Sequence, residues 1–177
     1  QGEILNADDF VDRPPNKKEC RRLLIQASGN AEKIEAWNRL TERWVAPVHT
    51  PKWRPHLSSK ENPWRPAEIV LSVRASDGSR VTARLIHAQL DGADLSGSNF
   101  QGCMMNFASL EGADLQSTIL REAKLNQAIL DGATLEGARL AGAVFNDSSM
   151  RGVKLIGAVF SEEDQVRIFG LVQMRNV

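Results

Sequence analysis

The sequence predicts a mainly β protein built as a solenoid of square coils, and two spacings support this. Every fifth residue from position 85 to position 160 is large and apolar, sixteen times in succession. The residue two positions before each of these is no larger than threonine in fifteen of the sixteen cases. Five helical steps rotate a side chain by about 140°, and five strand steps move it to the opposite face, so neither regular element fits this period.

The large series predicts the core. Its members are Leu85, Leu90, Leu95, Phe100, Met105, Leu110, Leu115, Leu120, Leu125, Leu130, Leu135, Leu140, Phe145, Met150, Leu155 and Phe160. A chain that turns a corner every five residues keeps both series inside, and four such sides close a coil of twenty residues. Coils stack at roughly 4.8 Å, the interstrand spacing. Residues 83–160 therefore predict about four coils around an apolar column.

Three of the five-residue units carry a resemblance to a known family. Residues 93–97 (ADLSG), 98–102 (SNFQG) and 113–117 (ADLQS) resemble the pentapeptide-repeat family, whose pattern is A(D/N)LXX. The resemblance covers residues 83–162 and implies a right-handed quadrilateral β-helix of 16 pentapeptides. The Asp/Asn position is kept only in Asp94, Asn99 and Asp114. Because that position points outward, the resemblance leaves the surface individual and implies little about function.

Residues 1–66 have a different pattern and contain all four tryptophans. Asn30 can cap a helix that starts at Ala31, with an apolar face of Ile34, Trp37, Leu40 and Trp44. A shorter helix is expected over residues 16–27, and the proline-rich residues 47–66 favour an extended segment. We expect this N-terminal helical and extended region to pack on the solenoid, with four docking candidates: Trp37, Trp44, Trp53 and Trp64.

Two further segments are expected to protect the ends of the coil stack. Residues 67–82 predict a strand and hairpin that lead into the repeats and cover the first coil. Residues 161–177 predict a short C-terminal cap helix, because Ser161 and Asp164 have capping-box spacing before an apolar stretch. Uncovered coil ends are unpaired strand edges that promote aggregation.

Charge and cysteine content bound the class of partner. The net charge is zero, with 14 basic and 11 acidic groups in residues 1–82 and 8 and 11 in residues 83–177. This balance argues against nucleic acid as a partner. Cys103 occupies an inward repeat position where a disulfide with Cys20 is improbable, which favours a reducing, cytoplasmic location. The sequence contains no apolar run of 18 residues, so it predicts no membrane span. The chain does not begin with Met, so we expect a fragment, and a secreted bacterial effector stays an alternative.

The twenty-residue period sorts the outward positions into columns. An apolar patch is predicted from Ile86, Met104, Phe107 and Val144 on one side of the stack. An exposed patch of this kind is usually an interface. Two occupants are open: the N-terminal region of the chain itself, or a separate protein. Beside the patch, a column of asparagines predicts stacked amide hydrogen bonds that stabilise the turns: Asn106, Asn126 and Asn146.

The neighbouring corner predicts an acidic column of Asp91, Glu111 and Asp131, which ends at Arg151. Beside it lies a bare strip of glycines: Gly92, Gly112, Gly132 and Gly152. Like charges at interstrand spacing repel one another and attract a cation or a basic partner. Ordinary solvated surface is the alternative interpretation.

The sequence predicts no catalytic site, no metal site and no cofactor. His49, His56 and His87 lack the spacing to cysteines or carboxylates that a zinc site needs. No phosphate-binding glycine loop or metalloprotease motif occurs. The basic flank formed by Lys17, Lys18, Arg21 and Arg22 is interpreted as a solvated helix face.

Three functional hypotheses follow. The first is a non-catalytic protein–protein interaction scaffold that presents a rigid β-helix face to a partner protein. The second is a targeting or substrate-recognition module of a larger bacterial effector or multidomain protein. The third comes from the family resemblance, which includes DNA mimics that bind gyrase, although a net charge of −3 over the repeats is low for mimicry. No particular oligomeric state is predicted.

Overall fold

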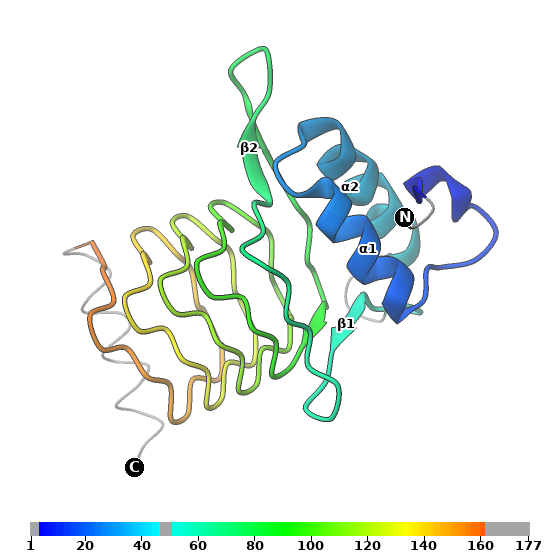
Figure 1. Cartoon of the computed structure of the whole chain (residues 1–177). Coiled ribbons are helices and arrows are strands. Elements are labelled where there is room, and N and C mark those ends of the chain that lie inside the picture. Colours follow the sequence, from blue (N-terminus) through cyan, green and yellow to red (C-terminus); the bar gives the residue numbers. More distant parts are fainter. Residues whose placement is uncertain (1–3, 47–50, 162–177) are drawn as a thin grey trace.

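The computed structural model describes residues 4–46 and 51–161, in which a helical N-terminal part lies against one end of a β-helix (Figure 1). The cap helix predicted for residues 161–177 lies outside the described residues except for Ser161. The elements follow in the order η1 (Ala7–Asp9), α1 (Lys17–Ala27), α2 (Ala31–Val45), β1 (His56–Ser58), β2 (Ser72–Arg74), β3 (Arg80–Thr82) and β4 (Gln89–Leu90).

Both predicted helices are confirmed, and asparagine caps fix where they begin. The side chain of Asn16 accepts a hydrogen bond from the backbone N–H of Glu19, whose carboxylate accepts from the N–H of Asn16 in return. Asn30 accepts from the N–H of Lys33 at 3.0 Å and starts α2. Each cap satisfies an amide that has no partner inside the helix. Of the predicted apolar face of α2, Ile34, Trp37 and Leu40 are buried and Trp44 is half-buried.

The β-helix is held by parallel pairing between residues twenty positions apart. Four rows of paired positions run along it: the Arg84 row (Arg84, Met104, Lys124, Val144), the Gln89 row (Gln89, Ser109, Ile129, Ser149), the Asp94 row (Asp94, Asp114, Thr134, Lys154) and the Asn99 row (Asn99, Ile119, Arg139, Val159). The N–H of Lys124, for example, donates to the carbonyl of Cys103 at 3.0 Å. The strands are only isolated bridges because the chain turns after each paired position.

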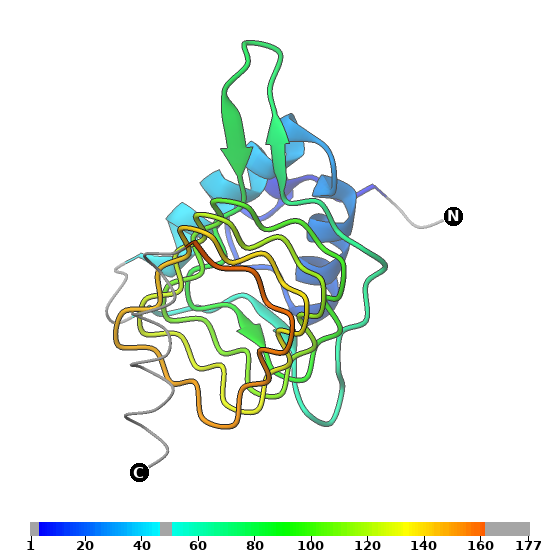
Figure 2. The same ribbon diagram turned by 90° about the vertical axis from the view of Figure 1, so that its left-hand side faces the viewer.

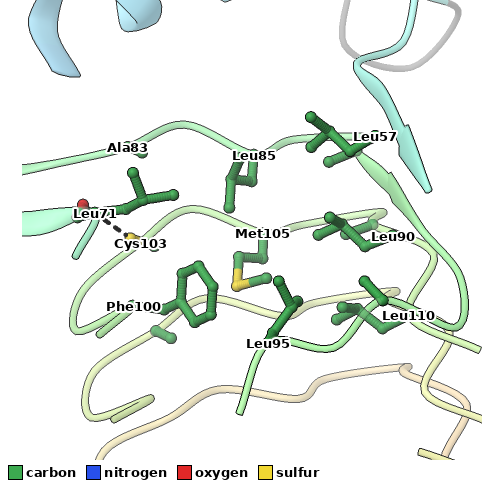
Figure 3. Close-up of a cluster of buried hydrophobic side chains, with 14 of the residues drawn as sticks. Leu57, Leu71, Ala83, Leu85, Leu90, Leu95, Phe100, Cys103, Met105 and Leu110 are labelled. Atoms are coloured by element: carbon green, nitrogen blue, oxygen red, sulfur yellow. Dashed lines mark hydrogen bonds between the residues drawn. The ribbon is translucent and has the colours of Figure 1, made fainter. Parts of the chain in front are cut away.

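The predicted apolar column forms the core. Fourteen of the sixteen large residues are buried, and only Leu155 and Phe160 in the last units are half-buried. Figure 3 shows Leu85 over Met105 and Leu90 over Leu110, with all four side chains directed inward. Burial of each such side chain stabilises the fold by roughly 1.5–3 kcal/mol before the entropy cost of ordering the chain.

The family's Asp/Asn position serves the corners where it is kept. The backbone N–H at the first position of a corner donates a hydrogen bond to the side chain two residues earlier. Asp94 accepts from the N–H of Ser96, Asn99 from that of Gln101 and Asp114 from that of Gln116, with N···O distances of 3.0 to 3.2 Å. Buried or half-buried amides require such partners.

At two corners where that position is lost, a side chain one coil earlier accepts the hydrogen bond of the same amide instead. Asn106 accepts from the N–H of Asn126 at 3.1 Å, and Asn126 accepts from the N–H of Asn146 at 3.2 Å. The predicted asparagine ladder is present, but its bonds run from side chain to backbone instead of from amide to amide. Asp131 does the same for the N–H of Arg151 at 2.9 Å.

Residues 55–71 run beside the first regular coil and pair with three of its rows. β1 lies parallel to β4, and the carbonyl of Pro55 accepts from the N–H of Gln89 at 2.8 Å. The carbonyl of Trp64 accepts from Asp94 at 2.8 Å, and that of Ile69 from Asn99 at 2.9 Å. The extended segment predicted from the prolines is therefore an irregular additional turn of the β-helix.

The fourth row is covered by α2. The indole Nε1 of Trp37 donates to the carbonyl of Arg84 at 2.8 Å, and the amide oxygen of Asn38 accepts from the N–H of Arg84 at 2.8 Å. The amide nitrogen of Asn38 donates to the carbonyl of Thr82 at 2.9 Å. Two adjacent helical side chains thus supply the hydrogen bonds that another coil would supply.

The hairpin forms, but it does not cover the first coil. β2 and β3 pair antiparallel, with Ser72 opposite Thr82, and the hairpin projects away from the coils beside α2 (Figures 1 and 2). Within residues 67–82, the pairing to the row below comes from Val70 and Leu71, next to Asn99.

Candidate functional site

One corner of the β-helix differs from the others in its side chains, although its backbone makes the same left-handed turn. We call it the side-chain corner: residues 86–87, 106–107, 126–127 and 146–147. Its second position is occupied by His87, Phe107, Gln127 and Asp147, all with φ between 56° and 61°. The next corner has glycine at all four equivalent positions: Gly92, Gly112, Gly132 and Gly152. A non-glycine residue in this left-handed region costs roughly 1–2 kcal/mol.

Aromatic stacking joins the first two members of this corner. The rings of His87 and Phe107 lie 4.8 Å apart at an angle of 12°. His87 is buried, whereas Phe107 is half-buried and reaches the surface. An offset stack of this kind adds about 0.5–1.5 kcal/mol and offsets part of the backbone strain.

The predicted apolar patch is only partly exposed. Ile86 retains 7% of its accessible surface because the C-terminal end of α2 covers it, so its prediction as an exposed contact residue is wrong. Met104, Phe107 and Val144 are half-buried and reach solvent. Lys124 is exposed and lies between Met104 and Val144 in the Arg84 row.

A cavity of about 180 Å³ lies where α2 meets the top of this row. It is lined by Thr41, Glu42, Val45, Ala46, Arg84 and Ile86. Arg84 and Glu42 form an ion pair at 3.6 Å, and Glu42 is largely exposed. A cavity of about 150 Å³ holds a benzene ring, so this one has room for a single apolar side chain.

The predicted acidic column is already partly engaged. Asp91 accepts from the hydroxyl of Ser109 and from the N–H of Glu111, and Asp131 accepts from the hydroxyl of Ser149. Glu111 pairs with Lys60 at 2.7 Å, so the extended N-terminal segment supplies a basic partner. Within residues 4–46 and 51–161, no group of three His, Cys, Asp or Glu side chains is placed to hold a metal.

The four tryptophans serve different surfaces. Trp37 and Trp64 are buried and hydrogen-bond to the first regular coil, Trp37 through its side chain and Trp64 through its backbone carbonyl. The indole of Trp44 donates instead to the carbonyl of Phe10 at 3.0 Å, within the N-terminal region. Trp53 is half-buried against the core.

Part of the basic helix flank is not solvated as predicted. Arg21 is half-buried and donates to the carbonyls of Leu57 and Asn62, the latter at 2.9 Å. Lys17 donates to Ser59 at 3.3 Å, and partial burial is the main cause that lowers its pKa. These contacts fasten α1 to residues 57–62.

The remaining chemically notable residues are placed apart. Cys20 and Cys103 are free and buried, and burial raises the pKa of each thiol to about 12. His56 is exposed in β1 and its pKa is lowered, mainly by desolvation, while His49 lies outside the described residues. In the described part of the chain, neither helix combines the length and apolar character needed to cross a membrane.

Sequence reasoning missed two parts of this region. Asn38 was not a candidate, because a polar residue beside a buried tryptophan is ordinary in an amphipathic helix and does not indicate contact with a backbone edge. The cavity depends on the docking of α2 and has no signal in the repeat period.

Comparison with protein families identifies the repeat region. The model for pentapeptide repeats matches residues 83–116 and 118–157, with eight copies. No curated protein sequence matches the chain significantly.

Solved structures similar to this chain are also pentapeptide-repeat proteins. Rfr23 from the cyanobacterium Cyanothece 51142 is 24% identical over 54% of this chain and 65% of its own, with a TM-score of 0.32. The alr5209 protein of Nostoc PCC 7120 is 24% identical over 45% of this chain and 81% of its own, with a TM-score of 0.28. QnrB1, a plasmid-mediated fluoroquinolone resistance protein, is 16% identical over 66% and 78%, with a TM-score of 0.28. This chain thus spans just under two thirds of Rfr23.

Proposed function

Because residues 83–157 form a domain of the pentapeptide-repeat family, we propose that this chain is a non-catalytic scaffold presenting a rigid β-helix face to a partner protein. The proposed scaffold has sixteen pentapeptides in about four right-handed quadrilateral coils. Pairing at twenty-residue spacing supports this geometry. A body whose backbone amides and apolar core are satisfied internally can vary its outward side chains without loss of fold.

The observation that carries the proposal is the side-chain corner. Gly112 and Gly132 occupy their corner positions without strain, whereas Phe107, Gln127 and Asp147 occupy the equivalent positions at a cost of roughly 1–2 kcal/mol each. Strain that persists where glycine would relieve it is characteristic of functional sites. Ser117 and Glu122 have the same backbone conformation singly at other corners, but among the described corners only this one carries a side chain at every turn, which supports a role for its surface.

We define the interaction face as Met104, Lys124 and Val144 of the Arg84 row together with Phe107, Gln127 and Asp147 of the side-chain corner. The backbone of this row is paired from coil to coil, so a partner cannot add a strand to it. Recognition therefore depends on side chains, and half-buried apolar groups around one lysine suit a protein surface.

The same site accommodates the second candidate function, a recognition module of a larger bacterial effector, because scaffold and recognition module bind through the same face. We propose a cytoplasmic location for the scaffold, supported by two free, buried cysteines. Binding of gyrase by DNA mimicry ranks lower, because the chain has a net charge of zero.

Site-specific photo-crosslinking tests the proposed function. A photoreactive amino acid at Gln127 is compared with one at Ser117, which is also exposed and also has a positive φ but lies at another corner. In the organism that produces the chain, we expect a protein adduct from position 127 and none from position 117. Equal adducts from both positions, or none from 127, would contradict the proposal.

A further inference from the structure

The lysine of the interaction face has no counter-ion among residues 4–46 and 51–161. Lys124 is exposed, and no carboxylate of the described residues lies within ion-pair distance of it, whereas Lys60 and Arg84 each have one. Its neighbours in the row, Met104 and Val144, are apolar. A carboxylate flanked by apolar groups would complement this arrangement of a cation between two apolar side chains.

The cavity under α2 provides a second anchor point on the same row. Its wall includes Val45 and Ile86, and its volume of about 180 Å³ suits one large apolar side chain. Interfaces are commonly anchored by a single bulky side chain in a pocket, surrounded by weaker contacts. The rim contains Arg84 and Glu42, which form an ion pair at 3.6 Å, so the entrance carries no net charge.

The distance between the two anchor points follows from the coil spacing. Arg84 lies on the cavity and Lys124 lies two coils further along the same row. Two coil steps of roughly 4.8 Å separate them by about 10 Å. An extended chain covers that distance in about three residues, at roughly 3.3 Å per residue. Met104 lies between the two points and offers an apolar contact to the connecting residues.

We propose that the interaction face binds an extended segment of the partner protein that carries a bulky apolar side chain and, about three residues away, an aspartate or glutamate. The apolar side chain enters the cavity under α2 and the carboxylate pairs with Lys124. This inference rests on the proposed scaffold function and specifies the chemistry of its partner. A single unpaired lysine excludes a phosphate backbone as the occupant, since nucleic-acid binding requires several neutralised phosphates.

The test uses a random library of 12-residue peptides displayed on phage and selected on the full chain. Enriched sequences are synthesised with a fluorescent label, and their affinity is measured by anisotropy. We expect enriched peptides to share an acidic residue about three positions from Leu, Met, Phe or Trp. Reversal of the charge by Lys124→Glu should weaken binding by about tenfold or more, as should Ala46→Phe, which fills the cavity from its exposed rim.

The matched control is Lys154→Glu. Lys154 occupies the same position of a repeat unit in the Asp94 row, is exposed, and does not belong to the interaction face. We expect its affinity for the same peptides to stay within about twofold of the unmodified chain, and thermal unfolding to be unchanged in all three variants.

Two results would overturn the inference. Either the selection enriches no acidic and apolar motif, or Lys124→Glu and Lys154→Glu weaken binding equally. In both cases an adduct from position 127 would leave the scaffold function standing, so the two proposals fail separately.

Discussion

Inside the β-helix, backbone amides pair with backbone carbonyls of a neighbouring coil in every row, whereas at the N-terminal end the Arg84 row is served by side chains of α2. The N–H of Lys124 donates to the carbonyl of Cys103 at 3.0 Å, and the N–H of Arg84 donates to the side chain of Asn38 at 2.8 Å. The irregular turn combines both schemes. Three of its backbone carbonyls accept from amides of the first regular coil, while the hydroxyls of Ser28 and Ser98 accept from the amides of Val70 and Ile69.

The difference teaches that a coil edge requires donors and acceptors at the right positions, and not necessarily another strand. Interior coils obtain these groups from the repeat itself, so their stability depends mainly on the apolar column. Along the Arg84 row, the N-terminal end obtains them from the side chains of Trp37 and Asn38, so each of these two is individually important. Substitutions in the two regions should therefore fail for different reasons.

The largest effect is expected inside the column. Leu115→Asp places an unpaired charge at a fully buried position and should unfold the middle coils, with a loss above about 4 kcal/mol. Gln116→Ala, on the exposed side of the same unit, should change the free energy of unfolding by less than about 0.5 kcal/mol. Urea denaturation followed by circular dichroism measures both, and similar losses would refute the assignment of inward and outward positions.

At the end of the stack, two substitutions of Trp37 separate packing from hydrogen bonding. Trp37→Ala should cost about 3–5 kcal/mol because it empties a buried site. Trp37→Phe keeps most of the contacts but leaves the carbonyl of Arg84 without its donor, which should cost about 1–3 kcal/mol. Chemical denaturation gives both values. A Trp37→Phe variant as stable as the parent would show that α2 covers the edge by packing alone.

The asparagine ladder predicts a smaller, chemically selective effect. Asn126→Ala removes the acceptor for the N–H of Asn146 and should cost about 1 kcal/mol, since that amide is partly reached by water. Asn126→Asp keeps an acceptor oxygen and should stay close to the parent at neutral pH. Thermal unfolding of the pair measures the difference, and equal destabilisation would mean that the bond itself contributes nothing.

The smallest effect has the opposite sign. Gln127→Gly removes roughly 1–2 kcal/mol of left-handed backbone strain and gives the unfolded chain extra freedom worth about 0.4–1 kcal/mol. The net expectation is stabilisation of about 0.5 kcal/mol, visible as a slightly higher Tm, together with weaker crosslinking to the partner. A lower Tm would indicate that Gln127 makes a stabilising contact and would remove the argument from strain.

The repeat period was sufficient to predict the core, because a single rule places Leu95, Leu115 and Leu135 in one buried column. The two helices were also predictable, because the cap residue Asn30 and the apolar face that follows it are local signals in the sequence. These features depend on neighbours in sequence or on a fixed period of twenty residues.

The remaining structure depends on how separate segments dock. Ile86 follows the outward period but is buried, because α2 lies over it, and no repeat rule contains the position of that helix. The lead-in of residues 67–82 was expected to cover the first coil. Residues 69–71 of it do pair with that coil, but the other pairs come from residues 55–64, which lack the five-residue spacing. The cavity of the candidate site was not predictable for the same reason, because it forms only where α2 packs against Arg84 and Ile86.

The register of twenty residues gives the chain a built-in unit of length. Removal of one complete turn, residues 103–122, would join Gly102 to Ala123 and bring Lys124 directly beneath Arg84 while keeping its direction. The separation between the lysine and the cavity would shorten by one step of roughly 4.8 Å, and no intermediate value is accessible. In proteins of this architecture, the distance between two binding groups in one row can thus change only by whole turns of the β-helix.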